Sequence, residues 1–176
     1  MTPEPDRHSA ELRFRSVFSH LGAVTAYARR RGSRDADGIA AETMTVAWRR
    51  LADVPEDDPR PWLYATARNL LLAEARKTAP TSGGYAGEGQ PAYELPELDP
   101  DLAAALRALG AADREALLLV AWEDLTPTQA AKALGINPTA FRVRLLRARR
   151  RLRAGLEERA ADDLAPAVAH LDVEGT

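Results

Sequence analysis

Apolar residues recur at helical spacing along most of this chain, beginning close to its N-terminus. The first stripe follows i, i+3, i+4 and i+7 spacing and predicts one amphipathic helix that is broken at Gly32 and Ser33. The members of this stripe are Phe14, Val17, Phe18, Leu21, Val24 and Ala28.

Two more helices are predicted before residue 78. The second runs from about residue 35 to residue 51, with acidic residues in its first turn, where the helix dipole favours them. The third begins at Pro59 or Pro61, because proline fits the first helical turn. Trp48 is also expected in the core. The other side chains expected to face inward are Ile39, Thr43, Val46, Ala47 and the Arg50 stem on the second helix, and Trp62, Thr66, Leu70 and Ala73 on the third.

The apolar pattern stops between residues 78 and 100. This stretch has four glycines, four prolines, four acidic residues and no basic one, which is typical of an extended linker. Beyond it, one helix is predicted around Leu102, Leu106 and Leu109, and another around Leu117 and Leu118.

Two short capped helices come next. Thr126 is a natural N-cap, and Gln129 closes a capping box. Gly135 suits the left-handed residue that ends this helix, and Asn137 caps the following one. Two capped helices joined by a turn of about three residues form a helix-turn-helix, whose second helix enters the major groove. The buried stripe of this last helix is predicted to be Phe141, Leu145, Ala148 and Leu152.

No segment reads as a strand, so the fold class is all-α, with two small helical domains joined by a flexible linker. The predicted boundaries are a flexible N-terminal arm at 1–9, a helical domain at 10–77, the linker at 78–100, the helix-turn-helix domain at 101–155 and an acidic tail at 156–176.

Charge is segregated along the chain although the formal net charge is −2. Residues 125–154 hold eight basic residues and no acid, whereas the tail from residue 155 holds six acids against one base. A basic helix alone can be a solvated face or can pair with an acidic tail. The preceding helix-turn-helix favours nucleic acid, because phosphates flank a helix in the groove. Two roles remain open for the acidic segments: the tail or linker could screen the basic helix in the free protein, or the acids could serve only solubility.

Several function classes are excluded by what the sequence lacks. It has no cysteine, no apolar run of the roughly 18–20 residues that a membrane span needs, and no N-terminal apolar signal segment. Its three histidines lack metal-ligand spacing, and no catalytic triad or glycine-rich phosphate loop can be defended. The expectation is therefore a cytoplasmic, nucleoid-associated protein that is not an enzyme and has no cofactor, metal or membrane insertion.

Two motifs in the first half resemble those of the extracytoplasmic-function (ECF) sigma factors, which initiate bacterial transcription. DADGIAAETM at residues 35–44 is similar to the family's acidic first-domain motif, with Gly38 and Ala41 as departures from it. WLYATARN at residues 62–69 resembles a second family motif. The helix-turn-helix also resembles the family's second domain, and the resemblance covers roughly residues 10–155.

The resemblance implies binding to core RNA polymerase and to promoter DNA, both duplex and melted, and control by an anti-sigma factor. The first domain would recognise and melt the −10 element through Asp53, Arg60, Arg68, Asn69, Arg76 and Lys77. The polymerase would contact Asp35, Asp37, Glu42 and Met44. The second domain would read the −35 element through the outward face of its last helix, at Thr139, Arg142, Val143, Arg144, Leu146 and Arg147, with Arg144 as a phosphate contact.

Two other functions remain open from the sequence. A free-standing helix-turn-helix repressor would bind duplex operator DNA without polymerase, but would leave the WLYATARN segment without a role. A helical interaction module could instead dock its basic helix on an acidic protein.

Overall fold

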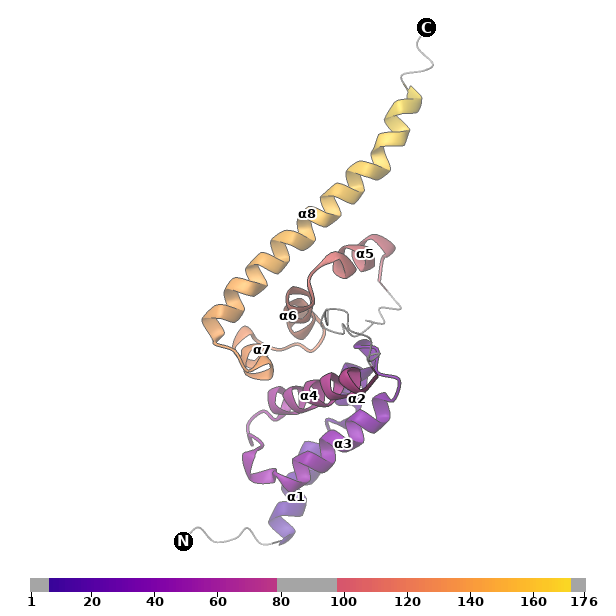
Figure 1. Cartoon of the computed structure of the whole chain (residues 1–176). Helices are drawn as coiled ribbons and strands as arrows, with labels where there is room; N and C mark the ends of the chain where they lie inside the picture. Colours follow the sequence, from indigo (N-terminus) through magenta and orange to yellow (C-terminus); the bar gives the residue numbers. More distant parts are fainter. Residues whose placement is uncertain (1–6, 79–97, 172–176) are drawn as a thin grey trace. The chain divides into compact units, whose positions relative to one another are not determined.

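The computed structural model describes residues 7–78 and 98–171, with side chains to residue 161 (Figure 1). The described residues form helices and turns without a strand, and the all-α prediction is confirmed. The described residues form two compact units, one of residues 7–78 with 128–136 and one of residues 98–127 with 137–171. The predicted linker and most of the N-terminal arm lie outside the described residues.

The first unit is built from α1 (Arg7–Phe18), α2 (Leu21–Arg30), α3 (Ala36–Arg49), the short 3-10 helix η1 (Leu51–Asp53) and α4 (Arg60–Thr78). Helix α2 packs on both α3 and α4, and α1 packs on α3. At the centre, the rings of Tyr27 and Tyr64 stack with centroids 4.8 Å apart, and the Arg31 guanidinium lies 3.4 Å from the Tyr27 centroid. This stack joins α2 to α4.

The single helix predicted for the first apolar stripe is wrong, because α1 and α2 are separate. The chain turns at Ser19 and His20, where the His20 amide bonds to the carbonyl of Val17 and the Ser19 hydroxyl bonds to the carbonyl of Ser16. Serine and histidine are weak helix formers, and a serine hydroxyl competes for backbone groups.

The inward face predicted for α4 is also wrong. The structure buries Leu63, Tyr64, Ala67 and Leu71 instead, a face about one residue out of phase with the predicted one. Trp48, expected in the core, is 44% exposed and contacts the Phe14 ring edge-on at 5.0 Å. The neighbouring Ala47 is fully buried, so a small side chain occupies the position closest to the packed helices.

The second unit contains α5 (Pro100–Ala108), α6 (Ala111–Ala121) and α8 (Pro138–Leu171), with α8 packed on the other two. Asp99 caps α5 by accepting from two backbone amides, and Arg114 fixes the α5–α6 turn by donating to the Leu109 carbonyl at 2.8 Å. The predicted stripe of α8 is buried at Phe141, Leu145 and Ala148. These packed side chains hold the start of α8 against α6.

The turn from helix α7 (Pro127–Leu134) into α8 has the predicted local geometry. Gly135 has φ +65°, and the Ile136 amide bonds back to the Ala131 carbonyl, as in a helix end closed by a left-handed glycine. Asn137 then accepts from the Thr139 amide at 2.7 Å and caps α8. The turn predicted from the cap residues is confirmed.

Helix α8 continues without a break from Pro138 to Leu171. At 1.5 Å per residue, Glu157 lies roughly 27 Å along the helix axis from Thr139. Because Glu157 and Glu158 are held on the same helix, they cannot fold back over its first turns, and the screening hypothesis is contradicted for these two acids. None of the helices that the structure describes combines the length and the apolar character needed to cross a membrane.

Candidate nucleic-acid interface

The outward face of α8 carries the residues predicted to read duplex DNA. Thr139, Arg142 and Arg147 are exposed, and the apolar side chains of Val143 and Leu146 are 43% and 51% exposed. Because Phe141, Leu145 and Ala148 anchor the opposite face, this surface is presented by a fixed helix start. It combines guanidinium donors, which suit guanine, with apolar groups, which suit the thymine methyl.

The remaining arginines of α8 differ in their surroundings. Arg144 is half-buried, whereas Arg149, Arg150 and Arg153 are exposed. Arg151 forms an ion pair with the buried carboxylate of Asp113 on α6. Arg151 therefore contributes to packing in the second unit, a role that its place in the arginine run did not reveal.

In the first unit, the loop between α3 and α4 holds Asp53, which was predicted to contact DNA, and Asp58. Asp53 is exposed and paired with Arg50, whose Nε lies 2.8 Å from its carboxylate. At the other end of the loop, Asp58 receives two side-chain hydrogen bonds from Arg60 at 3.0 and 3.1 Å. Asp53 and Arg60, both predicted to contact DNA, are thus held by partners within the loop region.

The protonation of Asp58 reflects this pairing. Burial raises the pKa of its carboxyl, but hydrogen bonds from the side chain and backbone of Arg60, the Arg60 charge and a hydrogen bond from the Gln129 side chain together outweigh burial. The pKa of Asp58 is therefore below its usual value, and the carboxylate is ionised at neutral pH.

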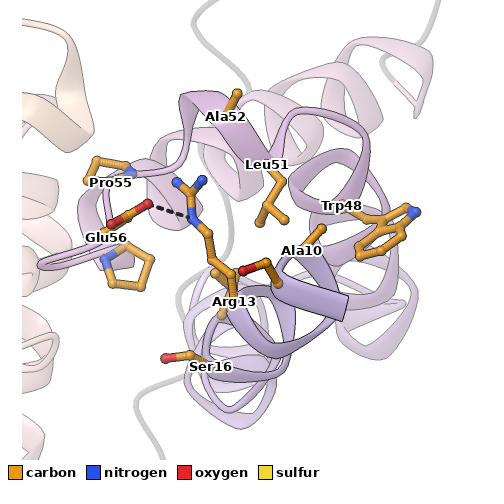
Figure 2. A pocket seen from close by; sticks show the side chains of 11 residues that line it. Ala10, Arg13, Ser16, Trp48, Leu51, Ala52, Pro55 and Glu56 are labelled. Carbon is orange, nitrogen blue, oxygen red and sulfur yellow. Dashed lines mark ion pairs between the residues drawn. The ribbon is translucent and has the colours of Figure 1, made fainter. Parts of the chain in front are cut away.

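A third contact links the loop to α1. Arg13 donates to the Val54 carbonyl at 2.6 Å and forms an ion pair with Glu56 at 3.3 Å. Figure 2 shows Arg13 reaching from α1 toward Pro55 and Glu56, across a pocket of about 480 Å³. Sequence reasoning missed Arg13, because no local signal relates it to a loop some 40 residues away.

The predicted basic track follows α4 away from the loop. Asn69, Arg76 and Lys77 are exposed and Arg68 is half-buried. Trp62, at the start of α4, is half-buried, and the Arg50 guanidinium lies 5.9 Å from its ring centroid. The structure thus leaves most of this track open to solvent along one helix.

The predicted polymerase-contacting residues lie on α3 and divide into exposed and buried members. Asp37 and Glu42 are exposed, and Asp35 is exposed while capping α3 through the Gly38 amide at 2.8 Å. Met44 is 2% exposed and packs in the core, so we leave it out of the proposed surface. A Cβ at Gly38 would meet the Asp35 carboxylate, so the glycine at this departure from the family motif accommodates the cap.

The structure shows no candidate metal site among the described residues, since no three His, Asp or Glu side chains converge. A direct comparison with curated protein sequences gives no match. Two family models do match, Sigma-70 region 2 over residues 17–81 and Sigma-70 region 4 over residues 100–152.

Solved structures show the same fold. The sigma factor RpoE from Bartonella quintana, in complex with the anti-sigma factor NepR, is 23% identical, with a TM-score of 0.58 over 81% of this chain and 95% of that one. CnrH in complex with the cytosolic domain of CnrY is 24% identical, also at 0.58, over 88% of this chain and 91% of that one. With regions 2 and 4 matched in this order over residues 17–81 and 100–152, the chain belongs to the sigma-70 family.

Proposed function

We propose that this protein binds core RNA polymerase and directs it to promoters with two recognition elements. The observation that carries this proposal is the presence in one chain of region 2 and of a region 4 whose α8 exposes Arg142 and Arg147. Sigma factors are regulatory proteins, and we infer that this chain acts in the cytoplasm at the nucleoid without catalysis or a cofactor.

We assign the −35 element to the outward face of α8. Its cap at Asn137 and its buried stripe fix the helix start, and its exposed face offers both hydrogen-bond donors and apolar groups. Arg142 and Arg147 would pair with bases, while Arg144 would contact phosphate.

We assign the −10 element to the α3–α4 loop and the basic track of α4. Recognition of a melted element requires a base to leave the stack and to be held by contacts to its edge and face. The loop offers carboxylates fixed by ion pairs, and Arg76, Lys77 and Asn69 offer exposed donors for the strand. Asp35, Asp37 and Glu42 on α3 would contact the polymerase.

An anti-sigma factor is a further proposed partner. Both structural relatives are described in complexes, one with an anti-sigma factor and the other with the cytosolic domain of CnrY. A protein of this kind would keep the two units from engaging polymerase until released.

The experiment that tests the function mixes the purified protein with core polymerase. We expect co-migration on gel filtration and initiation at promoter DNA only when both are present. A repressor would instead bind duplex DNA alone and would neither co-migrate with polymerase nor support initiation. The region 2 match argues against the repressor, because that reading leaves α1–α4 without a function.

A further inference from the structure

Arg13 connects α1 to the middle of the α3–α4 loop by two different contacts. Its guanidinium donates to the backbone carbonyl of Val54 at 2.6 Å and lies 3.3 Å from the carboxylate of Glu56. Val54 is 1% exposed, whereas the Glu56 side chain is 77% exposed. Arg13 therefore contacts both the buried Val54 and the exposed side chain of Glu56, two residues further along the loop.

The other two arginine contacts of the loop are local. Arg50 pairs with Asp53 three residues later, and Arg60 pairs with Asp58 two residues earlier. These pairs shape the two ends of the loop, but each stays within its own segment. Arg13 instead ties the loop to a helix that is distant in sequence, and so fixes where the loop lies on the unit.

An open pocket lies between α1 and the loop beside this contact. The pocket of about 480 Å³ is bounded by α1 residues on one side and by loop residues including Leu51, Ala52 and Pro55 on the other. Figure 2 shows the Arg13 side chain extending toward Glu56, with which it forms an ion pair, and Trp48 among the residues that line the pocket. Removal of Arg13 would therefore remove two polar contacts between α1 and the loop, at Val54 and at Glu56.

We propose that Arg13 is a positioning residue that holds the α3–α4 loop in the conformation that discriminates the −10 base. Helix α1 thereby influences promoter specificity without touching the base. The proposal rests on the proposed role of the loop in reading the −10 element. A partly buried charge-assisted contact has the strength needed for this, and arginine provides the geometry for two acceptors at once.

The test uses full-length variants reconstituted with core polymerase, on promoters that differ only in the −10 base. The measured quantity is the ratio of initiation on the best base to that on the worst. We expect Arg13→Ala to lower this ratio roughly fivefold, the effect of losing about one net hydrogen bond, with polymerase affinity unchanged.

Three further variants separate positioning from simple charge. Arg13→Lys keeps the charge but cannot bridge two acceptors in the same way, so we expect an intermediate ratio. Glu56→Gln leaves the Val54 contact in place and should lower the ratio less than Arg13→Ala does. Arg15→Ala, an exposed arginine on the same helix, is the matched control and should leave the ratio unchanged.

Hydrogen exchange of the free variants gives a second readout. Arg13→Ala should speed amide exchange in residues 51–59 while the amides of α2 stay protected as in the original protein. If this variant fails to fold, Arg13→Lys and Glu56→Gln carry the test, and a ratio unchanged in both overturns the proposal.

The failures of the two proposals are distinguishable. If replacing residues 53–58 alters base preference but Arg13→Ala does not, the positioning role is wrong and the −10 assignment stands. If neither change alters the preference, the loop does not read the base, and both assignments fall.

Discussion

The α3–α4 loop and the outward face of α8, both proposed to meet DNA, handle positive charge in opposite ways. In the first unit, Arg13, Arg50 and Arg60 each pair with an acid of the α3–α4 loop. In the second unit, Arg142 and Arg147 stand exposed within the segment 125–154, which contains no acid.

Because of this difference, the loop and α8 are expected to interact with DNA through different forces. Arginines that are neutralised by their neighbours add little long-range attraction, but they fix the shape of a loop. Exposed arginines on a helix attract phosphate at a distance, and their binding weakens as salt rises. The loop is therefore suited to discrimination at short range, and α8 is suited to capture of duplex DNA as well as to reading it.

The largest expected effect lies on α8. Arg142→Ala or Arg147→Ala should reduce initiation at particular −35 sequences, because loss of a bidentate base contact costs about 1–3 kcal/mol of discrimination. Initiation rates on a set of −35 variants measure this effect. An equal loss on every −35 variant would show that these arginines contact phosphate and do not read bases.

A somewhat smaller effect is expected from the loop. Replacing residues 53–58 with the corresponding loop of another ECF sigma factor should change the preferred −10 base, with preference ratios moving roughly tenfold. Polymerase affinity, measured by gel filtration or fluorescence titration, should remain intact. Unchanged preference would support a solvated turn with no contact to the base.

The salt dependence of duplex binding should distinguish the exposed arginines of α8 from the paired arginines of the loop. Arg149→Ala should lower the slope of log affinity for duplex DNA against log salt by about 0.9, the value for one phosphate contact. Arg50→Ala, which removes an arginine already paired with Asp53, should leave the slope of duplex binding unchanged. Equal slopes for the original protein and the Arg149 variant would show that this arginine does not reach phosphate.

The smallest expected effect concerns pH. Because the pKa of Asp58 is lowered in the folded protein, its contribution to the free energy of unfolding is complete above its ordinary pKa of 3.8. That contribution is lost as pH falls through the lower pKa of the folded state. Asp58→Asn should therefore destabilise the protein at neutral pH, by under about 1 kcal/mol for such a pair, and the difference should vanish in acid.

Urea unfolding at several pH values measures this dependence, with the exposed Asp57→Asn as control. A difference between Asp58→Asn and the original protein that stays constant down to pH 2 would contradict the assignment of the Arg60 pairing.

Sequence alone predicted the helix-turn-helix well, because its signals are local. Asn137 bonds to an amide two residues later, and Gly135 needs only its own backbone freedom to end α7. The buried stripe of α8 was also predictable, because arginines occupy the remaining faces of this helix. Assignment of its outward face to particular bases stays a prediction.

The first unit was less predictable because its packing depends on distant partners. Residues 62–73 are apolar on several faces, so periodicity does not fix the phase of α4, and the stacking of Tyr64 on Tyr27 decides it. Trp48 lies beside Ala47, and only the packed helices determine which of them is buried. Arg13 could not be linked to the loop without knowing that α1 runs past it.

The most direct test of the central claim is transcription in vitro from a genomic promoter library with reconstituted holoenzyme. We expect initiation to depend on this protein and the active templates to share two elements, one read as duplex and one melted. Protein that binds duplex DNA but does not associate with core polymerase, or that supports no selective initiation, would contradict it.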